Sequence, residues 1–400
     1  MGLQIRQAVI FAGGYGKRLA PFTDTAPKPM YPIAGKPYIE HLILQIRNFG
    51  IHEVVLLLGY LPEKIMDYFG DGSRYGMTFR YVVTDVECET QKRILAAKDL
   101  LDERFLMMYC DNYCPIDFQK LVMDAEDHDA MIQITAYANK DGYTKNNLRI
   151  AENGCVLSYD KKRTLPDLAG VDIGYAILDK RILELTNEEN DNFEAVVYPQ
   201  VVAQGKMYAT VTEHRYYSIG SFERIALTEE FFKHKKFVFL DRDGTINVRP
   251  PKACYVERPE DFIWLPGAIE AVKQLNNAGY LVILISNQPG IARGRLTEEI
   301  LQSIHNKMIL DLANAGAHID KIYYCPHNWD EGCECRKPKP GMLYQAQKDF
   351  SLNLRTGYLI GDDERDIEAG NAAGCHSILV GDEYMVLDAV KDIIHMGGRL

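Results

Sequence analysis

The chain has 400 residues, of which 47% are hydrophobic and 25% charged, and its formal net charge is −11. This length exceeds one ordinary hydrophobic core and predicts two domains. The negative charge argues against broad binding to nucleic acid or to anionic membranes, and no apolar run reaches the roughly 18 residues of a membrane span. Because the first residues lead directly into a predicted strand, we expect no signal peptide and a cytoplasmic protein with reduced thiols.

The first half of the chain alternates apolar strands with helical patterns. Strands are predicted at residues 7–12, 54–58, 79–83, 105–109 and 131–138, and a helix at about 38–49. This alternation is typical of an α/β domain with a doubly wound, mainly parallel sheet. A helical stretch at 221–234 leads into the second half without a Gly/Ser/Pro-rich linker, so we expect domains at 1–234 and 235–400.

A glycine-rich loop follows the first predicted strand. In it, Gly13, Gly14 and Gly16 precede the basic pair Lys17-Arg18. Glycines at the end of a strand let backbone N–H groups approach phosphate oxygens, and the basic pair adds positive charge. Such a loop is also a common tight turn, and it is not a Walker A loop because no Gly-Lys-Ser/Thr follows.

The run from Phe11 to Pro37 closely resembles the signature of sugar-1-phosphate nucleotidyltransferases. In that family a sugar-phosphate oxygen attacks the α-phosphorus of an NTP, and pyrophosphate leaves. The resemblance implies that the three glycines hold the nucleotide. It also implies that Arg18 and Lys28 act in catalysis by neutralising the triphosphate, because negative charge shifts onto the leaving pyrophosphate.

Other positions of the first half follow or depart from this resemblance. The resemblance implies that Asp111, after the strand at 105–109, binds Mg²⁺ and that Lys161 grips the sugar phosphate. Many relatives carry a second metal aspartate where this chain has Ser218, and a hydroxyl is a poorer ligand for Mg²⁺ than a carboxylate. The base-reading segment at 87–94 looks somewhat closer to sugar cytidylyltransferases, so the choice between GTP and CTP and the level of activity stay open.

The second half repeats the α/β pattern. Strands are predicted at residues 237–240, 281–285, 321–324 and 357–360, with helices at about 266–278, 297–315 and 341–349. We therefore expect a second doubly wound, mainly parallel domain. The apolar run at 237–240 ends in Asp241-Arg-Asp243, and a buried strand that delivers two carboxylates to its tip places a metal site and a nucleophile together.

These motifs, with Ser286-Asn287, Arg336-Lys337 and Asp362 at later strand ends, resemble the haloacid dehalogenase-like phosphatases. The resemblance implies that Asp241 attacks phosphorus to form an aspartyl phosphate. Asp243 would protonate the leaving group and then activate water. Ser286 and Lys337 would bind the transferring phosphate, with Asn287 and Arg336 as further substrate ligands. The Mg²⁺ ligands would be Asp241, Asp243 and Asp362.

Three of the nine cysteines crowd into residues 325–335. Cys325-Pro-His327 and Cys333-Glu-Cys335 offer three thiolates and one imidazole within eleven residues, a set that suits tetrahedral Zn²⁺. Because four ligands fill the coordination shell, the zinc should be structural and should pin the loop that carries the phosphate-binding lysine. The alternative is buried cysteines beside a surface histidine.

The zinc loop, with the runs 287–294 and 335–342, resembles one branch of these phosphatases. That branch includes the D-glycero-D-manno-heptose 1,7-bisphosphate 7-phosphatases and the histidinol-phosphate phosphatases. The short gap between the zinc half-sites favours the histidinol-phosphate type, and the neighbouring transferase-like domain favours the heptose type.

Together the resemblances imply a bifunctional enzyme with an NTP and phosphorylated sugars as its partners. It would remove the 7-phosphate of the heptose bisphosphate and transfer a nucleotidyl group, with GTP favoured, to heptose 1-phosphate. Two alternatives stay open. One is a cytidylyltransferase and phosphatase acting on another phosphorylated sugar or polyol, and the other is a phosphatase whose N-terminal domain only binds nucleotide. The sequence leaves the sugar and the oligomeric state open.

Overall fold

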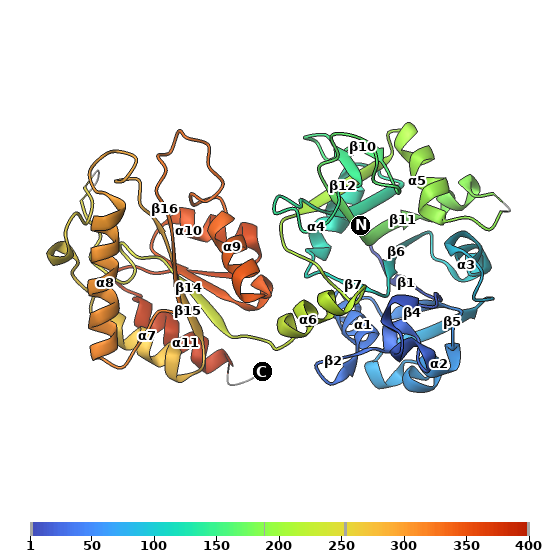
Figure 1. The fold of residues 1–400 in the computed structure, drawn as a ribbon, viewed down its shortest axis with the longest axis horizontal. Helices are drawn as coiled ribbons and strands as arrows, with labels where there is room; N and C mark the ends of the chain where they lie inside the picture. The colour runs from blue at the N-terminus through green and yellow to red at the C-terminus, as the bar shows by residue number, and fades with distance from the viewer. Residues whose placement is uncertain (1–2, 188, 252–253, 398–400) are drawn as a thin grey trace. The chain divides into compact units, whose positions relative to one another are not determined.

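The computed structural model describes residues 3–187, 189–251 and 254–397, and it divides into two compact units, residues 1–233 and 234–400 (Figure 1). This division lies one residue before the expected domain boundary. The outer ends of both expected domains, residues 1–2 and 398–400, lie outside the described residues.

The first unit is built on a seven-stranded sheet with the strand order β12-β8-β11-β6-β1-β4-β5. These strands are β1 (Gln7–Ala12), β4 (Glu53–Leu58), β5 (Thr78–Val83), β6 (Arg104–Tyr109), β8 (Ile132–Tyr137), β11 (Val171–Asp179) and β12 (Met207–Thr212). β1 pairs in parallel with β4 and β6, whereas β11 runs antiparallel to β6 and β8. The predicted mainly parallel sheet is confirmed, with one antiparallel strand that the sequence analysis did not predict.

Helices cover both faces of this sheet because its central strands are apolar on both sides. Along β1, Ala8 and Ile10 join one hydrophobic core while Val9 and Phe11 join the other, as the two-residue period of a strand requires. The helices are α1 (Tyr38–Asn48), α2 (Pro62–Phe69), α3 (Thr90–Ala96), α4 (Phe118–Asp127), α5 (Phe193–Ala203) and α6 (Phe222–Phe231). The first core takes side chains of α1, α2, α4 and α6, and the second takes those of α3 and α5.

Short strands complete the first unit. They are β2 (Pro32–Ile33), β3 (Lys36–Pro37), β7 (Asn112–Tyr113), β9 (Leu148–Ile150), β10 (Val156–Tyr159) and β13 (Tyr217–Ser218). They form three two-stranded sheets, β2 with β3, β9 with β10, and β7 with β13. The pair of β7 and β13 is important for the site. β7 follows β6 directly, and β13 joins it from about 100 residues later in the sequence.

The second unit is a five-stranded parallel sheet with the order β16-β15-β14-β17-β18. Its strands are β14 (Phe237–Leu240), β15 (Leu281–Asn287), β16 (Lys321–Cys325), β17 (Tyr358–Gly361) and β18 (His376–Leu379). Its helices are α7 (Ala268–Asn277), α8 (Glu298–Asn314), α9 (Gly341–Phe350), α10 (Glu364–Ala373) and α11 (Val386–Gly397). The core on one face takes side chains of α7, α8 and α11, and the core on the other takes those of α9 and α10, so the unit is doubly wound.

The fold places the predicted motifs at one edge of each sheet. The carboxyl ends of neighbouring parallel strands meet at the same edge, which is where open α/β sheets bind ligands. β1 lies between β6 and β4, and β14 lies between β15 and β17, so loops from three strands converge beside each central strand. In the described part of the chain, no helix is both long and apolar enough to cross a membrane.

Candidate active sites

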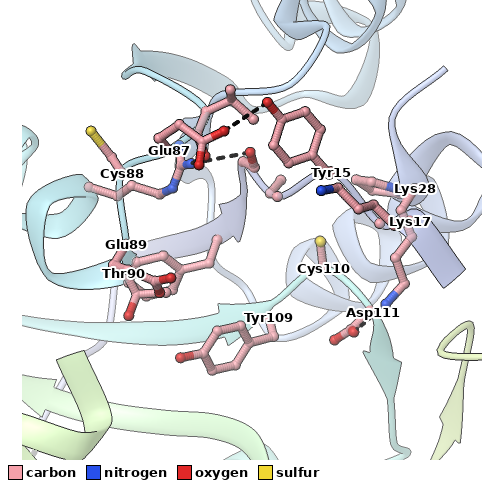
Figure 2. Close-up of a pocket in the computed structure, with 18 of the residues that line it drawn as sticks. Tyr15, Lys17, Lys28, Glu87, Cys88, Glu89, Thr90, Tyr109, Cys110 and Asp111 are labelled. Carbon is pink, nitrogen blue, oxygen red and sulfur yellow. Dashed lines mark hydrogen bonds and ion pairs between the residues drawn. The ribbon is translucent and has the colours of Figure 1, made fainter. Parts of the chain in front are cut away.

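The glycine-rich loop after β1 lines a cavity of about 530 Å³ in the first unit (Figure 2). Gly13 and Gly14 leave the strand, and Gly16 adopts a left-handed conformation with φ of 66°. A Cβ atom at Gly16 would lie 2.5 Å from the Cβ of Lys28, so a larger residue would push the lysine segment away. Glycine at position 16 therefore lets Lys28 pack against the loop and reach the cavity.

Lys28 and Asp111 form an ion pair on the wall of this cavity. Lys28 Nζ lies 2.6 Å from Asp111 Oδ2, and Asp111 follows β6 just as predicted from its place after an apolar strand. The exposed Arg18 lines the same cavity. The structure thus brings together the predicted glycines, the two predicted cations and the predicted metal-binding aspartate.

Ser218 lies next to Asp111, where a second metal ligand would be useful. In the pair of β13 and β7, Ser218 is opposite Asn112, and the N–H of Ile219 donates to the carbonyl oxygen of Asp111 at 3.2 Å. Among the described residues, no cluster of three or more Asp, Glu, His or Cys ligands includes Asp111. The role of Asp111 in metal binding stays a prediction.

Lys161 is held beside the cavity by an acidic residue that the sequence analysis did not single out. It forms an ion pair with Glu194, a side chain only 2% exposed that also accepts a 3.1 Å hydrogen bond from the Tyr159 hydroxyl. Lys161 Nζ lies 5.8 Å from the ring centroid of Tyr109, which lines the cavity. Burial lowers the pKa of Lys161, although the neighbouring Asp172 opposes this effect.

In the second unit, Lys337 ties together two buried carboxylates. Its Nζ lies 2.6 Å from Asp241 Oδ1 and 2.5 Å from Asp366 Oδ1, and it donates to the carbonyl oxygen of Ile285 at 3.1 Å. Asp241 directly follows β14 and is 7% exposed. Burial raises the pKa of Asp241 to about 7, against the attraction of Lys337. The predicted nucleophile and the predicted phosphate-binding lysine are therefore in contact.

Three carboxylates of this unit lie close enough to share one cation. Asp241, Asp362 and Asp366 each offer an oxygen, and these atoms lie within 4.8 Å of one another. Oxygen ligands of this kind fit Mg²⁺. Gly244, with φ of 99°, makes room for the cluster, since a Cβ atom there would lie 1.9 Å from Asp362 Oδ2. Asp366 was not predicted; it lies in the first turn of α10, whereas Asp362 precedes the helix.

Asp243 was predicted as a third metal ligand, but its carboxylate is not part of this cluster. Arg242 NH2 donates to Asp243 Oδ2 at 2.8 Å, Asn247 donates to Oδ1 at 3.0 Å and Gln288 donates to Oδ2 at 3.0 Å. Burial disfavours the ionised form, but Arg242 and the two amides outweigh it and lower the pKa of Asp243. Asp366 takes the place in the cluster that the prediction gave to Asp243.

Ser286 and Asn287 lie at the end of β15, as predicted. The Ser286 hydroxyl is buried and accepts a 2.7 Å hydrogen bond from Gln288 Nε2, the same amide that reaches Asp243. The Asn287 side chain forms two 3.0 Å hydrogen bonds with the backbone of Lys337, donating to its carbonyl oxygen and accepting from its N–H. Asn287 was predicted to contact substrate, and in this structure it positions the lysine.

The predicted phosphatase residues other than Asp362 line a second cavity of about 560 Å³. Its wall is rich in basic side chains, namely Arg249, Arg293, Arg336, Lys337 and Arg365. Arg336, predicted as a substrate ligand, also donates to the carbonyl oxygen of His327 at 3.2 Å, which connects the cavity to the cysteine-rich loop.

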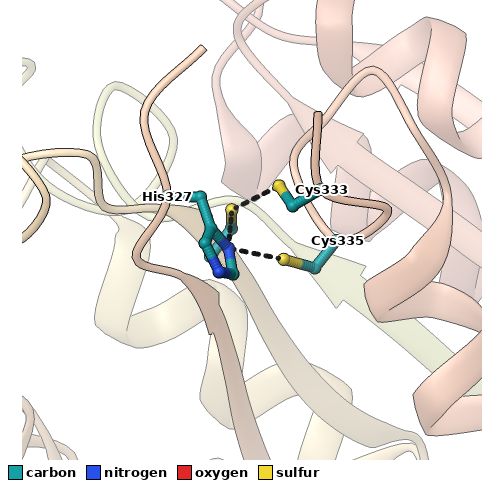
Figure 3. Close-up of side chains that lie close together, drawn as sticks. His327, Cys333 and Cys335 are labelled. Atoms are coloured by element: carbon teal, nitrogen blue, oxygen red, sulfur yellow. Dashed lines mark hydrogen bonds between the residues drawn. The ribbon is translucent and has the colours of Figure 1, made fainter. Parts of the chain in front are cut away.

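The cysteine-rich loop brings its four predicted zinc ligands together (Figure 3). Cys325 Sγ lies 3.6 Å from Cys333 Sγ and 3.5 Å from His327 Nδ1, and His327 Nδ1 lies 3.3 Å from Cys335 Sγ. Tetrahedral zinc would separate two sulfur ligands by about 3.8 Å and a sulfur from a nitrogen by about 3.6 Å. Three of the six ligand pairs therefore lie within a few tenths of an ångström of these values, and all four ligand atoms lie within 4.8 Å of one another.

Comparison with known proteins gives a match for each unit. Residues 7–226 match the family described as nucleotidyl transferase, and residues 334–391 match the one described as HAD-hydrolase-like. The chain is 43% identical over 145 residues to the D-glycero-beta-D-manno-heptose-1,7-bisphosphate 7-phosphatase of Pasteurella multocida, a match of 35% of this chain and 77% of that protein. It is 39% identical over 180 residues to the Vibrio cholerae protein of the same name, a match of 40% of this chain and 95% of that protein.

A solved structure supports the fold of the first unit. A UDP-glucose pyrophosphorylase complexed with UDP-glucose aligns with 57% of this chain and 99% of its own, at 19% sequence identity and a TM-score of 0.50. At this identity the likeness concerns the fold alone.

Proposed function

Since the chain belongs to the nucleotidyl transferase family through residues 7–226 and to the D-glycero-beta-D-manno-heptose-1,7-bisphosphate 7-phosphatases through its second unit, we propose that it catalyses two reactions of nucleotide-sugar synthesis. The second unit removes the 7-phosphate of D-glycero-D-manno-heptose 1,7-bisphosphate. The first unit transfers a nucleotidyl group, with GTP favoured, from an NTP to the resulting heptose 1-phosphate. The observation that carries the proposal is that each unit places a lysine–aspartate pair in a cavity at the end of its central strands.

In the phosphatase reaction, Asp241 is the nucleophile. Lys337 occupies its Oδ1, which leaves Oδ2 free to attack phosphorus. As the Asp241–phosphorus bond forms, the bond from phosphorus to the sugar oxygen breaks. Asp243 gives that oxygen a proton, which it must first take up from solvent because Arg242 and two amides favour its ionised form. Ser286 and Lys337 hold the phosphoryl oxygens. In the second half, Asp243 takes a proton from water, whose oxygen attacks phosphorus and releases phosphate and Asp241.

Two metal ions fit this proposal. Asp241, Asp362 and Asp366 would hold Mg²⁺, which would neutralise charge where a phosphate meets three carboxylates. Cys325, His327, Cys333 and Cys335 would hold a structural Zn²⁺. Arg336 links this loop to the phosphatase cavity, so the zinc would keep that basic side chain in place.

In the transferase reaction, an oxygen of the sugar 1-phosphate attacks the α-phosphorus of the NTP and pyrophosphate leaves. The backbone of the glycine-rich loop lies along the phosphates, and Arg18 and Lys28 stabilise the charge that moves onto the pyrophosphate. Lys28 already pairs with Asp111, so binding of the triphosphate would replace that contact and free Asp111 for Mg²⁺. Lys161, beside the cavity, is placed to hold the phosphate of the sugar.

The test is to incubate the full chain with Mg²⁺, each of the four NTPs and a panel of sugar 1-phosphates and bisphosphates, and to measure pyrophosphate and phosphate separately. We expect phosphate from the heptose 1,7-bisphosphate and pyrophosphate from an NTP with heptose 1-phosphate. Pyrophosphate from CTP with a different sugar or polyol phosphate would favour the cytidylyltransferase alternative.

A second candidate function is a phosphatase whose first unit binds nucleotide without reacting. Ser218 favours it, because its backbone lies beside that of Asp111 and this chain has a hydroxyl where many relatives carry a second carboxylate, which is the better ligand for Mg²⁺. Nucleotide binding with no pyrophosphate from any of the tested pairs would make this the better proposal.

A further inference from the structure

The proposed acid of the phosphatase reaction, Asp243, contacts an arginine that solvent does not reach. Arg242 is 0% exposed, and among the residues that the structure describes its guanidinium forms an ion pair with Asp243 alone. Arg242 Nε lies 3.2 Å from Asp243 Oδ1 and NH2 lies 2.8 Å from Asp243 Oδ2, so the planar guanidinium contacts both carboxylate oxygens. Asp243 lines the phosphatase cavity, and Arg242 is not among the described residues that line it. The arginine therefore acts on a bound substrate through the aspartate.

The other side of the Arg242 guanidinium faces His305 of α8. Arg242 NH1 lies 3.5 Å from His305 Nε2, and the histidine is 3% exposed. Burial, and after it the charge of Arg242, lowers the pKa of His305 to about 4, so the imidazole is neutral at neutral pH and its Nε2 can accept a hydrogen bond from the guanidinium. A buried helix face thus limits where Arg242 can move.

Two amides complete the hydrogen bonds of the Asp243 carboxylate. Asn247 Nδ2 donates to Oδ1 and Gln288 Nε2 donates to Oδ2, each at 3.0 Å, and both side chains are at most 1% exposed. Of the three donors, Arg242 alone carries a charge. Because hydrogen bonds between charged groups are about twice as strong as those between neutral groups, Arg242 contributes most to the orientation of the carboxylate.

The Asp243 carboxylate also has a competing partner. Asp243 is two residues from Asp241, which forms the candidate Mg²⁺ cluster with Asp362 and Asp366, and the charge of Asp243 acts on Asp241. A cation in this cluster attracts a neighbouring carboxylate, and the cluster would gain a fourth carboxylate ligand if Asp243 turned toward it. Asp243 would then no longer be available to give a proton to a leaving group.

We propose that Arg242, supported by His305, is a positioning residue that holds the Asp243 carboxylate out of the metal cluster and in place for proton transfer. The inference rests on the proposed phosphatase reaction, in which Asp243 protonates the sugar oxygen that leaves. Arg242 has a second effect that acts in the opposite direction, because its charge favours the ionised form of Asp243. The two effects predict opposite results when Arg242 is removed, so an experiment separates them.

The first measurement is metal binding, which needs no turnover. Mn²⁺, a paramagnetic probe for the Mg²⁺ site, is titrated into the full chain, and free Mn²⁺ is followed by electron paramagnetic resonance. Arg242→Met should tighten Mn²⁺ binding by about 10-fold, because Asp243 becomes free to join the cluster. Adding Asp243→Asn to this variant should cancel the gain. In Arg242→Met the Asp243 carboxylate is 24% exposed and keeps its two amide donors, so the chain should stay folded.

Arg365→Met is the matched control for metal binding. Arg365 lines the same cavity and pairs with Asp363 at 2.8 Å, so its removal takes the same charge from the site without a direct contact to Asp243 being lost. A general loss of positive charge would tighten Mn²⁺ binding equally in the two arginine variants. Loss of the position of Asp243 requires a larger gain in Arg242→Met.

The second measurement asks whether proton transfer suffers. Nitrophenolate leaves phosphorus without a proton and phenolate is more basic, so a general acid matters more for phenyl phosphate than for p-nitrophenyl phosphate. We expect Arg242→Met to lower the first-turnover rate for phenyl phosphate relative to p-nitrophenyl phosphate by about 10- to 100-fold, a part of the roughly 100- to 10,000-fold that a general acid contributes. Both rates come from one preparation, so a lower fraction of folded protein cancels. His305→Leu should lower this ratio partway, and His305→Gln, which keeps an acceptor, should restore it.

The proposal is overturned if Arg242→Met leaves the ratio of the two aryl phosphates unchanged or raises it, since a higher ratio means that the arginine acts only by keeping Asp243 ionised. It is also overturned if the gain in Mn²⁺ binding persists after Asp243→Asn or is matched by Arg365→Met. Failure of the proposed phosphatase reaction looks different, because the unaltered chain would release no phosphate from heptose 1,7-bisphosphate or from either aryl phosphate. The Mn²⁺ titrations would still decide whether Arg242 keeps Asp243 from the metal.

Discussion

The two cavities differ in how much of a metal site the chain itself provides. The phosphatase unit gathers Asp241, Asp362 and Asp366 within 4.8 Å, with Lys337 already in contact. The transferase unit offers Asp111, paired with Lys28, and among the described residues no further ligand group joins it in a cluster. Proteins often hold Mg²⁺ by one or two carboxylates and let substrate phosphates complete the shell. If Asp111 binds Mg²⁺ as predicted, the first unit would need its nucleotide to complete a cation site, whereas the second unit supplies three carboxylates of its own.

Replacing the proposed nucleophile should have the largest effect, because it should abolish the activity of the second unit and leave that of the first unit unchanged. Asp241→Asn should lower phosphate release by at least about 1,000-fold, because an amide does not form an acyl phosphate. Lys337 keeps Asp366 as a partner, so the unit should stay folded. Pyrophosphate release should be unchanged. Phosphatase activity close to that of the unaltered chain would show that Asp241 is not the nucleophile.

Substitutions in the first unit should lower pyrophosphate release and leave phosphate release unchanged, with a smaller loss than that expected for Asp241→Asn. Asp111→Ala and Arg18→Ala should each lower pyrophosphate release by about 100-fold, the typical loss when one electrostatic contact to a transition state is removed. Phosphate release by the same preparations is the control and should not change. If both activities fell together, the two reactions would not be assigned to separate units.

The cysteine-rich loop tests whether the second unit depends on a structural metal ion. The purified chain should contain one Zn²⁺, and Cys333→Ser should lower its zinc content and reduce phosphate release by about 10-fold through a looser loop. Thermal unfolding of the first unit should be unaffected. Metal analysis that finds no zinc after reducing, chelator-free purification would contradict this prediction.

The smallest expected effect comes from adding a second carboxylate to the first unit, which tests whether its single aspartate limits Mg²⁺ binding. Ser218→Asp would give the first unit a second carboxylate beside Asp111 and should raise its Mg²⁺ affinity or its rate by less than about 10-fold, because nucleotide phosphates already supply most ligands. Titration of pyrophosphate release with Mg²⁺ measures this change. A loss of activity would mean that the added charge repels the triphosphate and that the serine suits the site as it is.

The sequence predicted most of the strand-end motifs, because their order along the chain repeats the order of apolar strands. It did not predict β11 as a strand at all, so the antiparallel pairing of β11 with β6 and β8 was not anticipated. Asp366 was within reach of prediction, because it lies in the first helical turn after the same strand end that carries Asp362. The contact between Lys161 and Glu194 was not, because these residues are 33 positions apart and neither has a distinctive pattern.

The placement of Asp243 shows a different limit. Its neighbour Arg242 is adjacent in sequence, and Asn247 lies four residues further along the same loop, but Gln288 reaches the carboxylate from the loop after β15. Residue spacing along one strand predicts which groups share a sheet edge, and it does not predict which donors each carboxylate turns toward. The hydrogen-bond partners of a carboxylate depend on how the loops fold over the site, as the contact of Gln288 with Asp243 shows.

Gly244 has a consequence for how this site tolerates change. Its backbone conformation favours glycine, and the space that a side chain would need is taken by Asp362. Even alanine would force a carboxylate of the metal cluster to move. In a saturation library screened for phosphate release, this position should therefore return glycine alone, while the transferase activity of every rejected variant survives.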